Sequence, residues 1–554
     1  MSRDLHGLGV SAGSAAGPAA RLGTPPELPA VEPAVIDTRA EADRAVAALE
    51  TVGEFLRRRS AAASGEAAEI LMAEAMMAGD PTLAAKVRDL AGGGRPAAWA
   101  VSEALASYRA MLTSAGGYLA ERAADLNDIA DRAVALLLGE PMPGIPAPGH
   151  PFVLLAADLA PADTATLDPD TVLAIVTERG GPTSHTAILA KTLGIPAVVC
   201  CPGTLSVSDG TVVAVDGSAG TLVVEPAPEL VERAARQRAE RAARLAAAHG
   251  PGRTSDGHPV KLLANVGGPA DVPAAMAAEA EGIGLLRTEF LFLDRHDEPT
   301  GEEQRATYAE ILAGIGGRKV VVRTLDAGAD KPLAFASQEA EPNPALGIRG
   351  LRLDGLLPAL LDTQLEALAL AAKDTGADVW VMAPMVSTPA EAAAFADRVR
   401  EHGLPVAGVM IEVPAAALGA AQIFEQVDFV SIGTNDLSQY TFAADRQAGA
   451  LAPLLDPWQP ALLRLIAMTA DAGRAAGKPV SVCGEAASDP LLAIVLAGLG
   501  VTSLSMASPS LAEVRAALAE RSLAECEAAA VAALGAATPA AARTSAREQV
   551  TGTS

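Results

Sequence analysis

The chain has 554 residues, too many for one hydrophobic core, so two or three domains are expected. Its formal net charge of −25 argues against nucleic acid as a partner, because phosphate backbones select basic surfaces. The four cysteines suit neither a zinc site nor a disulfide framework, and no apolar run predicts a signal sequence or a membrane span. We therefore expect a cytoplasmic protein without direct membrane insertion.

The N-terminal part of the chain combines two sequence patterns. Short strand-like runs within residues 1–36 and 140–227 predict one α/β domain. Between them, residues 37–139 carry only helical periodicity, which predicts a helical subdomain inserted into that domain. Asp80 followed by Pro81 is typical of a helix start. The helices are expected at 37–57, 65–77, 81–90, 96–112 and 118–138.

The C-terminal part shows a regular alternation of strand-like and helical runs. Residues 228–250 predict a charged linker helix, and the eight strand–helix repeats in residues 251–530 predict a (β/α)8 TIM barrel. An open doubly wound sheet is the alternative, but the Gly-rich dinucleotide loop that it needs is absent. Residues 531–554 are rich in Ala, Thr and Ser and are expected to form a disordered tail. The barrel strands are expected at 260–266, 282–288, 320–326, 379–385, 408–413, 430–435, 480–484 and 503–506.

One histidine follows a Gly-rich turn between a buried strand run and a helical run. In the string Gly-Gly-Pro-Thr-Ser-His, which ends at His185, the glycines let the backbone approach a bound group. Thr183 and Ser184 can cap the helix, and free amides at a helix start favour an anion. His185 would present a nucleophilic imidazole where a phosphoryl group can be held. A lone histidine at a helix start is usually packed or capping, so the assignment depends on the whole string.

Polar residues follow most of the expected barrel strands, at the end where TIM barrels carry their active sites. Arginines bind phosphate and carboxylate through paired hydrogen bonds, and two carboxylates with phosphate oxygens and water make a plausible Mg²⁺ site. A cysteine there could deliver a proton to carbon, although most free cysteines are small buried residues. We expect a small anion with phosphate and carboxylate groups to bind. The residues concerned are Arg287, Arg323, Glu412, Asn435, Asp436, Cys483 and Glu485.

These motifs resemble a known family. The His185 string resembles the phosphohistidine loop of the phosphoenolpyruvate-utilising enzymes, and the barrel motifs resemble enzyme I of the bacterial sugar phosphotransferase system. The resemblance is collinear over residues 5–520. It implies transfer of a phosphoryl group from phosphoenolpyruvate to His185 and then to the histidine phosphocarrier protein, with release of pyruvate. The barrel motifs are Leu286–Phe292, Val322–Asp326, Asn343–Arg349, Ser431–Tyr440, Asp445–Arg446 and Cys483–Glu485.

The same resemblance implies a role for each candidate residue. Glu412 and Asp436 would hold Mg²⁺, and Cys483 would protonate the enolate carbon. The α/β domain would carry the phosphohistidine, the helical subdomain would dock the carrier protein, and the barrels would form a homodimer. Phosphoenolpyruvate would be bound by Arg287, Arg323, Asn435, Asp436 and Arg446, with Arg349 close by.

Three positions depart from the family pattern, and three other functions compete. Pro182 stands where many members carry arginine, Ala383 replaces a bulkier residue, and the stretch before Tyr118 is not acidic. Dikinases and synthases of the same superfamily need a large nucleotide-binding domain, for which about a hundred helical residues leave no room. A nitrogen-regulatory enzyme I would carry an N-terminal sensory domain. An inactive carrier-binding scaffold is disfavoured by the intact set of candidate residues.

Overall fold

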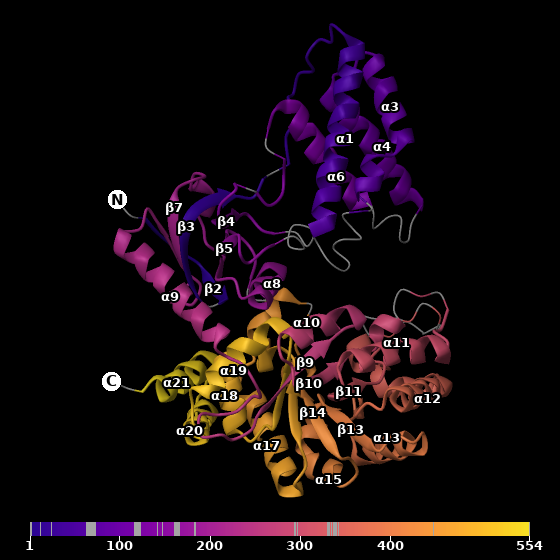
Figure 1. Cartoon of the computed structure of the whole chain (residues 1–554), viewed down its shortest axis with the longest axis vertical. Helices are drawn as coiled ribbons and strands as arrows, with labels where there is room; N and C mark the ends of the chain where they lie inside the picture. The colour runs from indigo at the N-terminus through magenta and orange to yellow at the C-terminus, as the bar shows by residue number, and fades with distance from the viewer. Residues whose placement is uncertain are drawn as a thin grey trace. The chain divides into compact units, whose positions relative to one another are not determined.

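The chain folds into two compact units, Met1–Ala239 and Glu240–Ser554, in the computed structural model (Figure 1). No helix in the described part is long and apolar enough to cross a membrane. The expected helix at 65–77 and the start of the one at 118–138 lie largely outside the described residues. The structure describes residues 3–11, 13–23, 25–62, 72, 74–115, 123–140, 142–146, 148–159, 167–181, 184–292, 295, 297–328, 333, 335, 341, 343–446 and 448–552.

A mixed eight-stranded sheet, in the order β1-β8-β7-β3-β4-β5-β6-β2, forms the α/β core of the first unit. The neighbours β3, β4, β5 and β6 run parallel, whereas the outer pairs are antiparallel. β4 and β5 are buried along their whole length, as expected of central parallel strands that read as continuous apolar runs. The strands are β1 (Arg3–His6), β2 (Leu8–Ser11), β3 (Ser14–Arg21), β4 (Phe152–Ala156), β5 (Val172–Thr177), β6 (Ala197–Val199), β7 (Val212–Asp216) and β8 (Thr221–Val224).

A group of helices lies between β3 and β4 in the sequence, which confirms the inserted helical subdomain. Their apolar faces share one core around Leu49, Leu83 and Ile129. The Asp80 side chain accepts hydrogen bonds from the backbone N–H groups of Thr82 and Leu83, so the predicted N-cap is confirmed. The described helices are α1 (Thr38–Ala62), α3 (Pro81–Gly92), α4 (Ala97–Ala115) and α6 (Ala123–Leu138).

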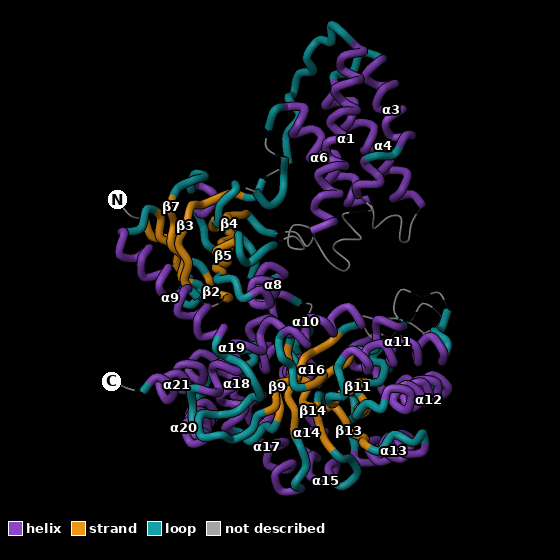
Figure 2. Tube along the Cα trace, in the orientation of Figure 1, coloured by secondary structure: helices purple, strands orange, loops and turns teal. Residues whose placement is uncertain are grey.

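Eight parallel strands close into a barrel in the second unit, with helices around it (Figures 1 and 2). The predicted TIM barrel is therefore confirmed. Its inside is filled by side chains that include Leu285, Met382, Met410, Phe429 and Cys483. The strands are β9 (Lys261–Val266), β10 (Gly282–Leu286), β11 (Lys319–Arg323), β12 (Val379–Ala383), β13 (Val406–Ile411), β14 (Phe429–Gly433), β15 (Val480–Cys483) and β16 (Ser503–Met506).

The barrel helices follow the predicted pattern, with two additions and one break. α10 (Val272–Ala277) and α16 (Thr434–Phe442) were not expected, and the helix predicted over 415–426 is broken at Gly419. α16 begins where a strand was predicted to continue to Asn435, because β14 ends at Gly433. The others are α11 (Gly301–Gly314), α12 (Pro358–Thr375), α13 (Pro389–Glu401), α14 (Pro414–Leu418), α15 (Ala420–Phe424), α17 (Pro460–Ala476), α18 (Pro490–Gly498) and α19 (Leu511–Ala519).

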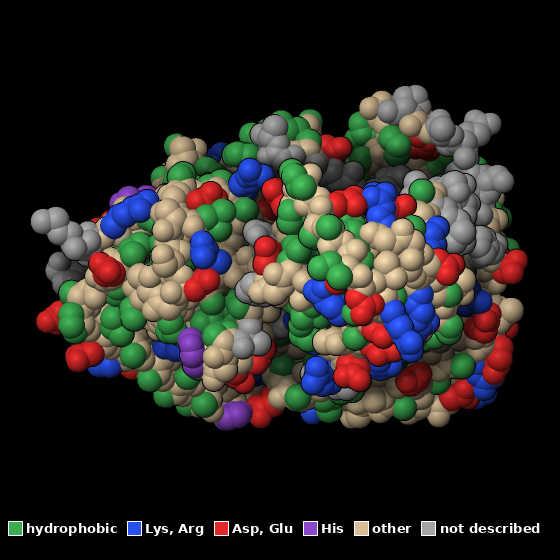
Figure 3. Space-filling view, turned by 90° about the horizontal axis from the view of Figure 1, so that it is seen from above, with side chains coloured by type: hydrophobic (Ala, Val, Ile, Leu, Met, Phe, Trp, Pro, Cys, Tyr) green, Lys and Arg blue, Asp and Glu red, His purple; other side chains and the backbone are tan. Residues whose placement is uncertain are grey.

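Two single helices stand apart from this repeat. α8 (His185–Leu193) follows β5 in the first unit, at the predicted strand-to-helix turn. α9 (Pro228–Ala246) is the predicted linker helix and ends four residues earlier than expected. On the face in Figure 3, Lys and Arg side chains lie among Asp and Glu, and no broad basic surface is visible among the residues drawn in colour.

The expectation of a disordered C-terminal tail is wrong. The chain forms α20 (Leu523–Leu534) and α21 (Pro539–Thr551), and Ala542 and Ala546 of α21 are fully buried. An Ala-rich composition suggested disorder, but alanine is also the strongest helix former and its small side chain lets helices pack closely.

Arg543 anchors α21 to the barrel. Its Nη2 lies 2.6 Å from Oδ2 of Asp489, and its guanidinium carbon lies 5.6 Å from the ring centroid of the buried Trp458. Asp489 also accepts a 3.1 Å hydrogen bond from Trp458 Nε1 and caps α18 through the backbone N–H groups of residues 491 and 492. Arg543 of the terminal helix α21 thus binds Asp489, the residue that caps the start of α18.

Arg543→Ala should lower the free energy of unfolding by about 1 kcal/mol, because the largely buried Asp489 then loses its cation. Chemical denaturation of the full chain measures this change. Arg547→Ala is the matched control, since Arg547 is exposed on the same helix one turn later. Equal effects of the two substitutions would contradict the anchoring role of Arg543.

Candidate active site

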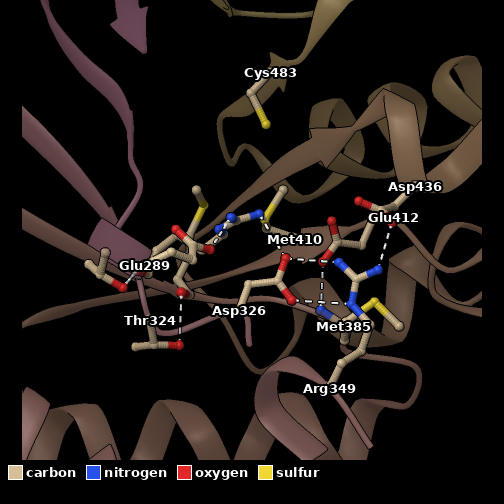
Figure 4. A network of polar contacts seen from close by, with 12 residues as sticks. Glu289, Thr324, Asp326, Arg349, Met385, Met410, Glu412, Asp436 and Cys483 are labelled. Atoms are coloured by element: carbon tan, nitrogen blue, oxygen red, sulfur yellow. Dashed lines mark hydrogen bonds and ion pairs between the residues drawn. The ribbon is translucent and has the colours of Figure 1, made fainter. Parts of the chain in front are cut away.

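The carboxyl ends of the barrel strands carry a connected set of charged side chains (Figure 4). Arg323 and Cys483 are the last residues of β11 and β15, and Glu412 directly follows β13. Asp436 lies in the first turn of α16, immediately after β14. The fold therefore brings four predicted site residues to one mouth of the barrel, as TIM-barrel geometry requires.

Two buried arginines share one carboxylate. Nη1 of Arg323 lies 3.1 Å from Oδ2 of Asp326, and Nη2 of Arg323 donates to Glu289. Arg349 binds the same Asp326 through Nε at 3.2 Å and Nη2 at 2.9 Å. Its Nη1 donates to Oδ1 of Asp436, also at 2.9 Å. All five side chains are less than a tenth exposed, so the network lies in a low-dielectric environment.

The arginines stay charged in this network. Burial alone would lower the pKa of Arg349, but the carboxylates of Asp326 and Asp436 raise it above its usual value. The pKa of Arg323 is likewise raised, because Glu289 and Asp326 outweigh its burial. In the described structure, the buried Nε of Arg323 has no hydrogen-bond partner. The site thus presents two permanently charged guanidinium groups, and one N–H donor of Arg323 is without a partner among the described residues.

Glu412 is a fully buried carboxyl with one unused oxygen. Its Oε1 accepts a 2.7 Å hydrogen bond from the backbone N–H of Met385, while Oε2 has no partner among the described residues. Burial, with the nearby carboxylates of Asp436 and Asp326, raises the pKa of Glu412 to about 8. Met385 has a φ of 61°, a strained value for a residue with a side chain. The backbone is thus held in the conformation that aims this N–H at Glu412.

Cys483 provides a protonated thiol at the same mouth. Burial raises the pKa of Cys483, so the thiol is protonated at neutral pH. The Ser431 hydroxyl donates to its sulfur at 3.3 Å, and the thiol donates to the backbone carbonyl of Ile432 at 3.6 Å. Such a group can act as a general acid.

Three predicted residues lie at the exposed rim of the mouth. Nη1 of Arg446 lies 3.7 Å from Oδ2 of Asp436, and Oδ1 of Asn435 accepts a 3.4 Å hydrogen bond from the backbone N–H of Glu485. Arg287 follows β10 and is exposed. Burial raises the pKa of the Cys483 thiol most, and the positive charge of Arg287 lowers it. These rim groups remain accessible to a ligand.

His185 belongs to the other unit, as the first residue of α8. Oγ of Ser184 accepts a 3.3 Å hydrogen bond from the backbone N–H of Ala187, so the predicted cap at Ser184 is confirmed. Gly180 has a φ of 93°, which favours glycine and explains the tight turn. Pro182, Thr183 and the side chain of His185 lie outside the described part.

Sequence reasoning missed four residues that organise the site. Asp326 and Glu289 stood inside quoted motifs, but nothing in the sequence singled them out as partners of buried arginines. Tyr440 donates to the backbone carbonyl of Ala345 and accepts a 3.3 Å hydrogen bond from Arg349 Nη1, so it also belongs to the network. Met385 acts through its backbone, which no residue-type pattern reveals.

Comparisons with known proteins cover the whole chain. Residues 241–523 match the family model for the PEP-binding domain of PEP-utilising enzymes, residues 148–220 the mobile domain, and residues 6–122 the N-terminal domain. A phosphoenolpyruvate-protein phosphotransferase of Streptomyces coelicolor is 56% identical and covers 100% of both chains. One of Bacillus sp. (strain S) is 39% identical over 93% of this chain and 92% of its own. A solution structure of an Enzyme I protein is 32% identical, covers 43% of this chain and 99% of its own, and aligns with a TM-score of 0.36.

Asp326→Ala should lower the free energy of unfolding by about 3 kcal/mol, because two buried guanidinium groups lose their shared carboxylate. Urea denaturation of the variant measures this loss. Asp374→Ala is the matched control: Asp374 pairs with Arg305 at 2.7 Å on the surface of the same unit, and its removal should leave stability unchanged. Similar losses in both variants would refute a special role for Asp326.

Proposed function

We propose that this chain, which belongs to the phosphoenolpyruvate-protein phosphotransferase family, carries the phosphoryl group of phosphoenolpyruvate on His185. The group then passes to a histidine phosphocarrier protein, and pyruvate is released, as the first step of sugar uptake by the phosphotransferase system. The observation that carries this proposal is the joint placement of buried arginines, Glu412 and Cys483 at one barrel mouth.

The arginines fit the substrate. Phosphoenolpyruvate carries a phosphate and a carboxylate, and guanidinium groups bind both through paired hydrogen bonds. Buried Arg323 and Arg349 are held in place by carboxylates before any ligand arrives, which reduces the entropy lost on binding. Further donors at the rim would complete the binding site, namely Arg287, Asn435 and Arg446.

A divalent metal fits the two carboxylates, and we assign Mg²⁺ to Glu412 and Asp436. The unused Oε2 of Glu412 is an available oxygen ligand, and a cation there would favour the ionised carboxylate that burial and the neighbouring acids disfavour. Among the described residues no group of three or more His, Cys, Asp or Glu could hold a metal, so substrate oxygens and water would complete the coordination. The metal would neutralise substrate charge and polarise phosphate oxygens.

Two side chains of the protein would carry out phosphoryl transfer and proton transfer, respectively. An imidazole nitrogen of His185 forms a bond to phosphorus as the bond from phosphorus to the enol oxygen breaks. The electron pair of that bond stays on the leaving enolate. The Cys483 thiol gives its proton to the methylene carbon, which yields pyruvate. Arginines around the leaving oxygen stabilise the negative charge that develops there.

Four accompanying assignments rest on the family resemblance. Residues 1–36 and 140–227 would form the phosphohistidine domain, and residues 37–139 the surface that docks the carrier protein. The barrel would mediate a homodimer. The protein would act in the cytoplasm.

His185→Ala should abolish acid-labile labelling of the protein by ³²P-phosphoenolpyruvate and Mg²⁺, because it removes the imidazole that is proposed to accept the phosphoryl group. Calorimetric binding of phosphoenolpyruvate should persist, since the barrel site is untouched. His249→Ala is the matched control, because its side chain is 69% exposed and pairs with Glu279, which precedes β10. Labelling of the His185→Ala protein at the normal rate would refute the assignment.

Glu412→Gln should weaken the binding of Mn²⁺, used as a spectroscopic substitute for Mg²⁺, by more than about tenfold, because an amide oxygen replaces a charged ligand. Electron paramagnetic resonance with phosphoenolpyruvate present measures the bound metal. The exposed Glu366→Gln on α12 serves as the control. Unchanged Mn²⁺ affinity in Glu412→Gln would place the metal elsewhere.

A further inference from the structure

Ser431 is a buried polar side chain that touches a proposed reacting atom. It lies on β14 inside the barrel, is fully buried, and donates its hydroxyl hydrogen to the sulfur of Cys483 at 3.3 Å. No other hydrogen-bond donor to this sulfur is found in the described part of the chain. A hydroxyl in that position has a direct effect on the chemistry of the thiol.

The strand register explains how Ser431 reaches the sulfur. Cys483 pairs with Gly433 across β14 and β15, and Ser431 pairs with Ser481 two residues earlier. Ser431 thus lies two positions before the partner of Cys483, and side chains two positions apart on a strand lie on the same face of the sheet. The hydroxyl of Ser431 can therefore reach the sulfur diagonally.

A second contact from the same segment fixes the backbone of Cys483. Oγ1 of Thr434, at the start of α16, donates to the carbonyl oxygen of Cys483 at 3.3 Å. Cys483 is thus held at two points, by Thr434 at its backbone and by Ser431 at its sulfur. The freedom of the thiol to turn away from the barrel mouth is reduced accordingly.

The Ser431 hydroxyl matters because proton transfer leaves a negative charge on the sulfur of Cys483. When the S–H bond of Cys483 breaks and a C–H bond forms on the methylene carbon, the S–H electron pair stays on sulfur as a thiolate. This anion is generated in a buried place, where an unsolvated charge is costly. A hydroxyl donor to the sulfur stabilises the thiolate, because hydrogen bonds to charged acceptors are the stronger ones. Ser431 keeps its own proton, and water restores the thiol after the product leaves.

We propose that Ser431 is a positioning residue for the protonation step: it orients the thiol of Cys483 and stabilises the thiolate that proton donation leaves. This inference rests on the proposed role of Cys483 as the proton donor. It predicts that loss of the Ser431 hydroxyl slows the formation of pyruvate without slowing the arrival of the phosphoryl group on His185.

The experiment measures both steps in a single turnover of the full-length protein with ³²P-phosphoenolpyruvate and Mg²⁺. Rapid quenching gives the rate of protein labelling, and lactate dehydrogenase in the same mixture reports pyruvate. In Ser431→Ala, pyruvate formation should slow about tenfold, the effect of one hydrogen bond to a charged group. The labelling rate and the concentration of phosphoenolpyruvate at half-maximal rate should change less than about twofold.

Ser481→Ala is the matched control, because it removes the same hydroxyl from the paired position on the next strand. Ser481 is also buried, but its Oγ has no hydrogen-bond partner among the described residues. It should therefore behave like the unmodified protein. Ser431→Thr keeps the hydroxyl and should restore most of the lost rate of pyruvate formation.

The outcomes separate this inference from the proposed function. Normal pyruvate formation in Cys483→Ala would show that Cys483 is not the proton donor, and would refute that part of the proposed function. Slow pyruvate formation in Cys483→Ala, with normal rates in Ser431→Ala, would overturn the role of Ser431 alone. Equal slowing of labelling and pyruvate formation in Ser431→Ala would reduce Ser431 to a packing residue, as would a folded Ser431→Thr protein no faster than Ser431→Ala.

Discussion

The barrel mouth depends on one buried carboxylate between two buried guanidinium groups. Charges removed from water are costly unless each has a partner, so Asp326, Arg323 and Arg349 can occupy this place only together. Their mutual contacts fix the positions of the cations before any ligand binds. An anion that enters therefore meets donors that are already oriented, which is the main requirement for electrostatic stabilisation of a transition state.

Close packing around the strand ends also fixes the positions of Glu412 and Cys483 beside this charge network. Gly433 leaves room for the carboxyl of Glu412, and Ser431 on the same strand donates a hydrogen bond to the sulfur of Cys483. The strained backbone at Met385 supplies the N–H that holds the other oxygen of Glu412. Backbone strain of this kind persists only where the surrounding structure fixes the conformation, and it often accompanies function.

Much of this organisation could be predicted from the sequence. Apolar runs such as Val172–Thr177 and the regular alternation after residue 251 reflect local periodicity, which is decided by neighbouring residues. The same holds for the cap at Asp80 and the helix start at His185. The candidate residues at the mouth could be named because parallel strands in a barrel all end on one side. The C-terminal helices were misjudged, because composition alone does not distinguish an Ala-rich helix from a disordered segment.

By itself, the sequence determined the order of the elements, the barrel and the residue types at its mouth, since these follow from the periodicity and spacing of residues along the chain. The tertiary structure alone decided which charges meet. Arg349 and Asp436 are 87 positions apart, and Ser431 and Cys483 are 52 apart. Such pairings follow from strand register and helix packing, which no local pattern records. The carboxylate shared by two arginines and the hydroxyl at the sulfur were therefore visible only in the folded chain.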